Sequence, residues 1–169
     1  MVIKLKVEPL TQEAFAPFGQ VIEMDMGKSF LINEGHTRRY HELAEVDVAD
    51  GGGTAIFSIF KSSRRAFPLE IKMMENHPLG SQAFLPMQAA DWLVVVSEGI
   101  DIPTAETCRA FLASASQGVQ YGKGVWHHPL LTLVAEQDFW IVDWGGKGDN
   151  LIEHYFEGNV ARVDIVPID

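Results

Sequence analysis

The sequence predicts a mainly β fold, a sandwich or barrel with one short helix near the N-terminus. Short apolar runs recur at close intervals along the 169 residues, and clusters containing Gly or Pro separate them. The helical segments that a doubly wound parallel sheet needs between its strands are missing from this pattern. No break in composition and no internal repeat divides the chain, so we expect a single domain over residues 1–169.

The expected elements follow from local pattern. Thr11–Phe18 is predicted as the short helix, because Thr11 can cap its start and Pro17 ends it. The last long apolar run, Leu131–Trp144, is expected to be a strand that breaks near Glu136–Gln137. The other expected strands are Val2–Val7, Thr54–Phe60, Leu69–Met74, Gln82–Met87, Trp92–Ser97, Arg109–Ala113 and Val160–Val166.

Composition excludes several classes of function. The net charge is −10, and the short basic clusters form no stripe, so we expect no nucleic acid and no membrane as partner. Cys108 is the single cysteine, which excludes an intrachain disulfide, and its apolar surroundings favour a buried residue over a reactive thiol. The N-terminus alternates like a strand rather than forming a signal peptide, and no apolar run is long enough to span a bilayer. We therefore expect a cytoplasmic protein.

Two His-Pro blocks are the strongest candidates for a functional site. The first contains Glu75, His77 and Gln82, and alternation along a strand would place Glu75 and His77 on one face. The second runs from Gly118 to a pair of adjacent histidines, His127 and His128. Neighbouring strand residues face opposite ways, so we expect His127 to face the interior and His128 to be a supporting or surface group.

Further polar residues suggest how a small acid would be bound. Arg39, Lys61 and Lys123 follow loops or end strands, where a cation can bind a carboxylate, although a solvated surface charge is the commoner fate. Asp143 ends an apolar strand just before two glycines, where it can orient a histidine, act as a base or cap the glycine turn.

The spacing of the two blocks resembles the paired motifs of cupins. Glu75, His77 and Gln82 match the first motif, and Gly118 with His127 matches the second. Glu75 stands where a His is usual, and Gln82 stands where a Glu is usual. Imidazole and carboxylate are good ligands for divalent metals, while an amide oxygen is a weaker one. The resemblance therefore implies a single cupin-like antiparallel β-barrel and a divalent-metal site at Glu75, His77 and His127.

A closer resemblance covers most of the chain. The segments 39–44, 77–87 and 125–130, with the N-terminal 9–15 and the late 142–146, are similar to ureidoglycolate lyases, also called ureidoglycolate hydrolases. This resemblance implies cleavage of (S)-ureidoglycolate to glyoxylate and urea during allantoin and purine breakdown. It also implies a homodimer, a small-molecule substrate, a divalent metal with nickel suggested for bacterial members, and no organic cofactor. Lys61 replaces an Arg of the family and loses its bidentate fork.

The chemistry of that substrate assigns roles to the candidate residues. Ureidoglycolate is a carbinolamide with a carboxylate, and its cleavage needs a base for the hydroxyl proton and an acid for the leaving nitrogen. His77 and His127 are the candidates for these tasks, unless they are metal ligands. Gln82 and Tyr40 are candidates to hydrogen-bond the urea group, and Arg39, Lys61 or Lys123 to hold the carboxylate.

Two other classes of function remain open from the sequence. One is a metal-dependent isomerase or dioxygenase of the cupin type that acts on another small acid. The other is a non-catalytic barrel that binds a small acid and signals through a partner. The first would bind iron or manganese without releasing urea, and the second would bind its ligand without turnover.

Overall fold

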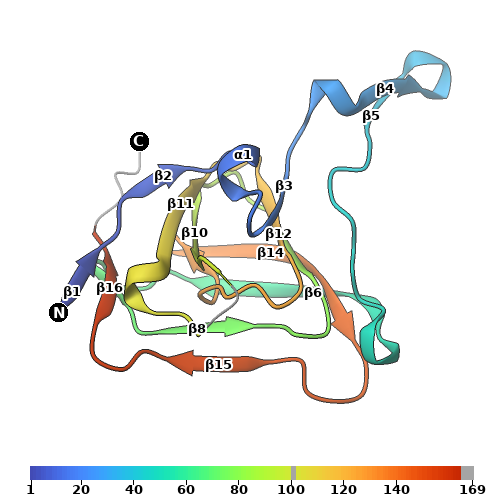
Figure 1. Ribbon diagram of the computed structural model, residues 1–169. Coiled ribbons are helices and arrows are strands. Elements are labelled where there is room, and N and C mark those ends of the chain that lie inside the picture. Colours follow the sequence, from blue (N-terminus) through green and yellow to red (C-terminus); the bar gives the residue numbers. More distant parts are fainter. Residues whose placement is uncertain (100–101, 165–169) are drawn as a thin grey trace.

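The protein is mainly β, as the sequence predicts. A computed structural model describes residues 1–99 and 102–164. In these residues there are sixteen strands, and the only α-helix is α1, Gln12–Phe15 (Figure 1). Short 3-10 turns occur at Met26–Lys28, Asn33–Gly35, Asp50–Gly52 and Ala105–Thr107. No helix in the described part of the chain is long and apolar enough to cross a membrane.

The largest sheet is antiparallel and has five strands in the order β3-β12-β9-β14-β6. Its strands are β3 (Gly19–Ile22), β12 (Gly118–Tyr121), β9 (Gln82–Pro86), β14 (Glu136–Gly145) and β6 (Thr54–Ser63). The central strands β9 and β14 pair on both sides, whereas β6 pairs only with β14 among the described residues. The sheet therefore ends in a ten-residue edge strand.

Two further sheets pack around the core. A four-stranded sheet has the order β13-β10-β11-β2, and a three-stranded sheet has the order β1-β16-β7. Their strands are β13 (Leu131–Thr132), β10 (Trp92–Ser97), β11 (Cys108–Ala113), β2 (Val7–Pro9), β1 (Val2–Lys4), β16 (Val160–Val163) and β7 (Leu69–Ile71). All six residues of β10 are buried, because one face packs toward the five-stranded sheet and the other toward the three-stranded sheet. The unbroken apolar run of this strand is thus explained by burial on both faces.

The expectation of a purely antiparallel fold is wrong for two pairs. Strand β2 runs parallel to β11, and β1 runs parallel to β16. Parallel strands need a long crossover between them, and in both cases most of the chain separates the partners. Among the described residues the ladders form separate sheets rather than one closed barrel, so the expected closed ring is not seen.

Strand β8 (Met73–Asn76) forms a two-stranded sheet with β15 (Ile152–Tyr155). Single-residue bridges join His127 to Glu75 of β8 and to Val96 of β10. The backbone N–H and C=O of His127 both bond to Glu75, at 2.8 Å each. These bridges hold the backbone of the second His-Pro block between β8 and the four-stranded sheet.

Helix α1 begins as predicted, with the side chain of Thr11 accepting a hydrogen bond from the Ala14 N–H. It ends earlier than predicted, because Pro17 lacks an N–H and the chain turns at Phe18, whose N–H bonds to the Phe15 carbonyl. Phe15 and Phe18 are both buried against Phe111 of β11. The helix therefore closes one end of the core.

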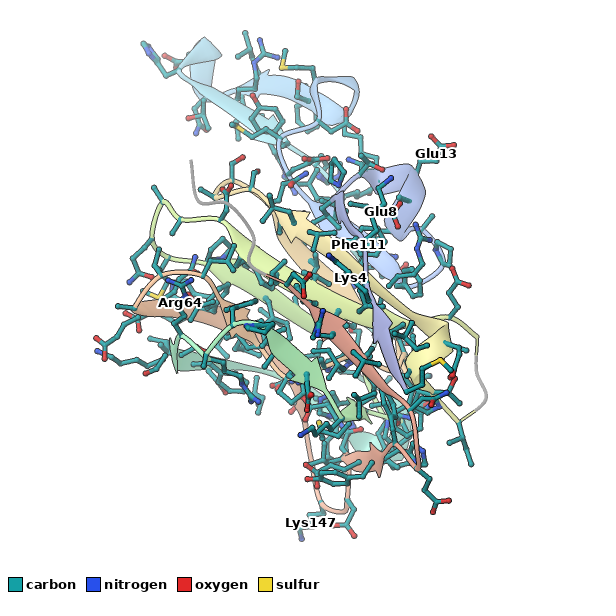
Figure 2. All side chains as sticks on the ribbon, turned by 90° about the vertical axis from the view of Figure 1, so that its left-hand side faces the viewer. Lys4, Glu8, Glu13, Arg64, Phe111 and Lys147 are labelled. Atoms are coloured by element: carbon teal, nitrogen blue, oxygen red, sulfur yellow. The ribbon has the colours of Figure 1, made fainter. Side chains whose placement is uncertain are left out.

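A hairpin of β4 (Ser29–Ile32) and β5 (Thr37–Tyr40) stands apart from the rest of the fold. We call residues 24–42 the arm. Two views at right angles both show the arm, in light blue, projecting away from the sheets (Figures 1 and 2). None of residues 22–70 is buried, a stretch that includes the arm and the edge strand β6.

Candidate active site

Glu75, His77 and His127 converge, as the spacing of the two blocks predicts. Their ligand atoms all lie within 4.8 Å of one another. His127 Nε2 is 3.6 Å from Glu75 Oε1, and the rings of His77 and His127 have centroids 5.4 Å apart. The paired backbones of Glu75 and His127 make the two side chains direct neighbours on one face, and His77 follows at the end of β8.

Hydrogen bonds at the far side of each ring fix which nitrogen faces the cluster. His77 Nδ1 lies 2.6 Å from the Asn150 carbonyl, and His127 Nδ1 lies 2.9 Å from the Val125 carbonyl. A carbonyl oxygen only accepts, so each Nδ1 carries a proton, and Nε2 is the nitrogen that holds the lone pair when the ring is neutral. Both Nε2 atoms are buried and have no hydrogen-bond partner among the described residues. Two acceptor lone pairs therefore point toward the carboxylate of Glu75.

The protonation of the cluster follows from burial and from its own charges. Burial lowers the pKa of His77, and the neighbouring His127 adds to this, while the Asn150 carbonyl and the Glu75 and Asp143 carboxylates oppose it. Burial alone would raise the pKa of Glu75, but the nearby imidazoles of His127, His77 and His128, which would become cations if protonated, hold it below its ordinary value. An ionised carboxylate beside a neutral imidazole is the state that binds a metal cation.

A row of three polar side chains lies across the five-stranded sheet. Tyr121 of β12 is opposite Gln82 of β9, and the β9–β14 register places Asp143 beside Gln82. Directly opposed residues share a face. Tyr121 stacks on the ring of His127 at 4.1 Å and 10°, which places this face toward the cluster. Gln82 Nε2 donates to Asp143 Oδ2 at 3.3 Å, and the other oxygens, Gln82 Oε1 and Asp143 Oδ1, are buried without partners among the described residues.

Asp143 was expected to orient a histidine, to act as a base or to cap the glycine turn. Its side chain bonds to Gln82 rather than to the turn, and its charge raises the pKa of His77. This geometry favours a role in the site over a turn cap.

His128 does not face the cluster as His127 does. Its Nδ1 bonds to the Pro129 carbonyl at 2.8 Å. The side chain is buried, so of the two expected positions, supporting or surface, the surface one is excluded, and burial lowers its pKa to about 4. His128 is therefore a neutral interior residue, held behind the site by the alternation of the strand.

The structure does not bring the expected carboxylate-binding cations to the cluster of their own chain. Arg39 and Tyr40 lie on the projecting arm (Figure 1). Lys61 pairs with Glu136 near the far end of β6. It lies five positions along the strand, or roughly 17 Å, from Ile56, which is the residue opposite Asp143. Lys123 lies close by, since the next residue bonds to the His77 carbonyl, but Asp50 at 2.7 Å and Asp47 at 3.3 Å already neutralise it.

Tyr121 and Asn150 are site residues that the sequence did not reveal. Tyr121 could have been found from the alternation of Gly118–Tyr121, which puts its side chain on the face opposite to that of Gln120. Asn150 offered no local signal, because it reaches the site from a distant loop: its carbonyl accepts from His77, and its side chain accepts from the Leu79 N–H.

Comparison with known proteins identifies the family. The sequence model described as ureidoglycolate lyase matches residues 2–163. The chain belongs to the ureidoglycolate lyase family. A protein named ureidoglycolate lyase from Pseudomonas paraeruginosa is 53% identical over 152 residues, covering 90% of each chain. Proteins of the same name from Pseudomonas syringae pathovars syringae and tomato are 49% and 51% identical and cover 98% and 94% of each chain.

The cluster of this ureidoglycolate lyase family member has the chemistry of a metal site. Two imidazole nitrogens with free lone pairs and one ionised carboxylate are the donor set that divalent transition metals prefer. Buried nitrogens without partners are costly unless something binds to them. The residues present therefore fit the divalent metal that the family resemblance implies.

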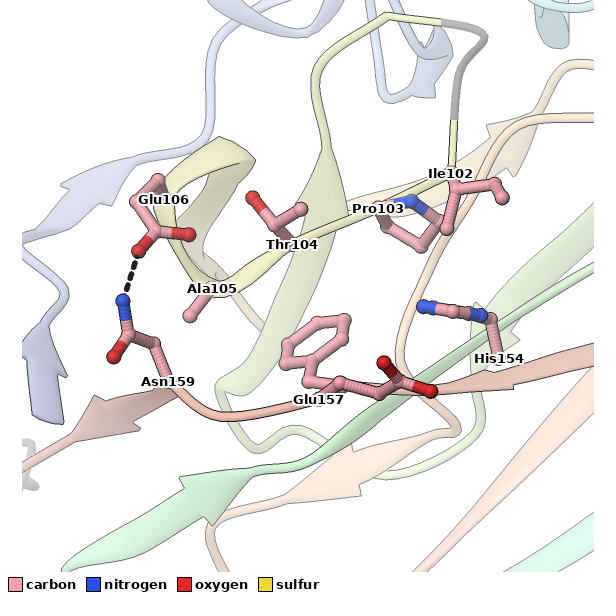
Figure 3. Close-up of a pocket in the computed structure, with 9 residues that line it drawn as sticks. Ile102, Pro103, Thr104, Ala105, Glu106, His154, Glu157 and Asn159 are labelled. Carbon is pink, nitrogen blue, oxygen red and sulfur yellow. Dashed lines mark hydrogen bonds between the residues drawn. The ribbon is translucent and has the colours of Figure 1, made fainter. Parts of the chain in front are cut away.

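A separate hollow in this family member contains His154. It is lined by residues 102–106 and by His154, Phe156, Glu157 and Asn159 (Figure 3). The His154 ring packs edge-on against Trp126 at 6.3 Å, and Glu106 accepts a hydrogen bond from Asn159. None of Glu75, His77 and His127 lines this hollow, so His154 takes no part in the cluster.

Proposed function

We propose that this protein is a ureidoglycolate lyase that cleaves (S)-ureidoglycolate to glyoxylate and urea with the help of a divalent metal. The observation that carries the proposal is the convergence of Glu75, His77 and His127, with two inward Nε2 lone pairs, next to the row of Tyr121, Gln82 and Asp143. The similarity to proteins named ureidoglycolate lyase along nearly the whole chain supports the same activity.

In this proposal Glu75, His77 and His127 hold the metal, and nickel is the first candidate to test. The bound metal would polarise the hydroxyl or carboxylate oxygen of the substrate. The carbonyls of Asn150 and Val125 hold both rings in the tautomer that leaves Nε2 free. We propose that the strands around this site belong to a cupin-like barrel, although their ladders form separate sheets among the described residues.

Asp143 is the group proposed to move the proton. Its Oδ1 is a buried acceptor without a partner, and Gln82 Nε2 holds the other oxygen. Asp143 would take the proton of the substrate hydroxyl as the carbon–nitrogen bond breaks and the electron pair passes to nitrogen. It would then return that proton to the nitrogen, so that glyoxylate and urea leave with no net proton change. The Gln82 Oε1 atom is placed to accept a hydrogen bond from the urea N–H₂.

A single assay tests this proposal. The nickel-loaded protein, the chelated protein and an enzyme-free control are each incubated with ureidoglycolate, and glyoxylate, urea and ammonia are measured. We expect glyoxylate and urea in equal amounts, no ammonia, and a large loss of rate on chelation. Tight iron or manganese binding without urea release would instead favour an isomerase or dioxygenase. The enzyme-free control is needed because the substrate also breaks down spontaneously.

The same assay tests the role of Asp143. We expect Asp143→Asn to lower kcat by about 10²–10⁴-fold, the usual contribution of a general acid–base group, with unchanged metal content. Asp138→Asn is the matched control, because Asp138 lies on the same strand and bonds to Gln88 far from the cluster. A full rate in folded Asp143→Asn would contradict the proposed proton transfer.

A further inference from the structure

The three residues of the cluster are held in place by different means. Glu75 lies inside β8, where it pairs with Glu153 of β15. His127 is joined to Glu75 by a backbone bridge. His77, in contrast, follows the last residue of β8 and belongs to no strand. Its position is therefore not set by strand pairing and depends on contacts from other segments.

Asn150 supplies the contacts that hold this turn. Its backbone carbonyl accepts a hydrogen bond from His77 Nδ1 at 2.6 Å, and its side-chain Oδ1 accepts one from the Leu79 N–H at 2.7 Å. These contacts span 73 and 71 positions of the chain, so they are tertiary contacts rather than products of a local turn. One residue thus bonds to both ends of the segment His77–Leu79 through two different acceptors.

The two contacts of Asn150 support each other. A backbone N–H only donates, so the bond from Leu79 directs the amide oxygen of Asn150 toward the turn. Residues 146–149, which lead into Asn150, are all exposed and belong to no strand. Without the side-chain bond, the carbonyl that receives the His77 proton would move with this loop. Hydrogen bonds weaken steeply as their angle departs from linear, so a carbonyl that moves would hold the ring poorly.

A second loop holds the backbone of the turn but not the ring. The Gly124 N–H donates to the His77 carbonyl at 2.9 Å, a bond that leaves the imidazole free to rotate. Among the described residues, only Asn150 bonds to the ring itself. The orientation of the His77 imidazole thus depends on Asn150.

The ring of His77 is bonded on one side only. Nδ1 bonds to Asn150, whereas Nε2 is buried and has no partner among the described residues. A histidine kept only for packing would normally have both ring nitrogens satisfied. A neutral imidazole can carry its proton on either nitrogen, and the bond at Nδ1 selects the form whose Nε2 lone pair is free. The contacts of Asn150 therefore prepare His77 to be a ligand.

We propose that Asn150 is a positioning residue of the metal site. Its side chain holds the loop so that its carbonyl keeps the His77 Nε2 lone pair directed at the metal. Asn150 acts through His77 and contacts neither the metal nor the substrate. The role of His77 as a ligand rests on the proposed function, whereas the control of its ring by Asn150 does not.

The ring of His77 in the metal-free protein tests this control directly. Long-range proton–nitrogen NMR spectra at pH 8, where the imidazole is neutral, report which ring nitrogen carries the proton. We expect only the Nδ1–H tautomer in the wild type and a mixture of both tautomers in Asn150→Ala. A His77→Gln variant identifies the signals of this ring. The pure Nδ1–H tautomer in folded Asn150→Ala would overturn the proposal.

Nickel affinity, measured by titration calorimetry on the metal-free protein, tests the consequence. Asn150→Ala should bind nickel about 10- to 100-fold more weakly, the usual cost of losing a group that orients a ligand. Asn150→Asp keeps an acceptor for the Leu79 N–H and should recover most of this loss. Affinity equal to that of the wild type in Asn150→Ala, or no recovery in Asn150→Asp, would contradict the positioning role.

Asp149→Ala is the matched control for these variants. Asp149 is the preceding residue of the same loop, is exposed, and makes no hydrogen bond or ion pair in the described structure. Its loss should leave the tautomer unchanged and the nickel affinity close to that of the wild type. The same variant measures what one loop charge contributes, which separates the recovery in Asn150→Asp from a simple effect of charge.

A further variant covers the case in which Asn150→Ala does not fold. The hydroxyl of Asn150→Ser is one bond too short to replace the amide oxygen at Leu79, so the same mixture of tautomers and the same weaker nickel binding are expected. A wild-type protein that binds no nickel and cleaves no ureidoglycolate would overturn the proposed function. The tautomer spectra need neither metal nor substrate, and they would still decide the role of Asn150.

Discussion

At the scale of single residues, the contact that most constrains the site is the stack of Tyr121 on His127. The two rings are nearly parallel, and both belong to side chains that are almost fully buried. The Val125 carbonyl fixes one edge of the imidazole, while the phenol ring fixes its plane. Together they orient the Nε2 lone pair before any ligand arrives, which lowers the cost of binding.

We predict that Tyr121 acts through this stack on the position of His127. Tyr121→Phe keeps the ring and should keep metal affinity close to that of the wild type. Tyr121→Leu removes the flat surface and should weaken metal binding about 10- to 100-fold, as is usual when the groups that support a ligand are lost. Titration calorimetry with nickel measures both variants. Equal affinity in folded Tyr121→Leu and wild type would rule out this positioning role.

The sequence predicted the cluster but not its support, and the reason is the range of the contacts. Glu75 and His77 are two positions apart, so strand alternation alone places them together, and the second block has one residue that can join them. Gln82 was expected at the site from its spacing to His77, whereas Tyr121 and Asn150 reach the site through strand pairing and a distant loop. Such pairing depends on register, which no local pattern reveals.

At the scale of elements, the segment 45–53, which we call the strap, holds the strands that carry the polar row. Gln120 donates to the Glu45 carbonyl, and the Asp47 carbonyl accepts from the Ser81 N–H at 2.7 Å. Trp144 Nε1 donates to the Asp50 carbonyl at 2.7 Å. These three anchors immediately precede or follow Tyr121, Gln82 and Asp143, so the strap ties together the strands beneath the row.

We predict that loss of one anchor loosens the strap without unfolding the sheet. Trp144→Phe keeps most of the packing but removes the bond to Asp50, and should cost about 1 kcal/mol of stability. Backbone amides of the strap should then exchange with deuterium faster than in the wild type, as followed by mass spectrometry. Trp140→Phe is the control, since Trp140 lies on the same strand, is exposed and makes no hydrogen bond in the described structure. Similar exchange in the two variants would refute the anchoring role.

The elements that the sequence missed have a common physical cause. Strand β10 was found at its observed bounds, because burial on both faces demands an unbroken apolar run. The arm was missed, since its strands pack on no core and so carry no alternation. The run Leu131–Trp144 was expected to break near Glu136–Gln137, and it does break just before Glu136: β13 ends at Thr132 and β14 begins at Glu136.

At the scale of the whole molecule, two buried ionisable groups link stability to alkaline pH. Burial raises the pKa of the Cys108 thiol to about 12, and burial likewise raises the pKa of Tyr121. Cys108 is a buried residue of β11, as expected, and its Sγ donates to the Thr104 carbonyl. The thiolate is therefore strongly disfavoured in the folded protein.

We predict that this thiol makes the protein less stable as the pH rises above about 9. In the unfolded chain the thiol titrates near its ordinary pKa of about 8.5–9, so above that pH the unfolded state binds fewer protons than the folded state. The free energy of unfolding then falls with increasing pH, by about 1.5–2 kcal/mol at pH 10 from Cys108 alone, and the loss continues toward pH 12. Tyrosine titrates about one unit higher in unfolded chains, so the window from pH 8 to pH 10 isolates the thiol.

Urea unfolding at several pH values measures the effect, with Cys108→Ala as the comparison. That variant should be less stable at pH 7 because of the cavity, but its stability should decline less steeply up to pH 10. Parallel declines in the two proteins would show that Cys108 is not the group responsible.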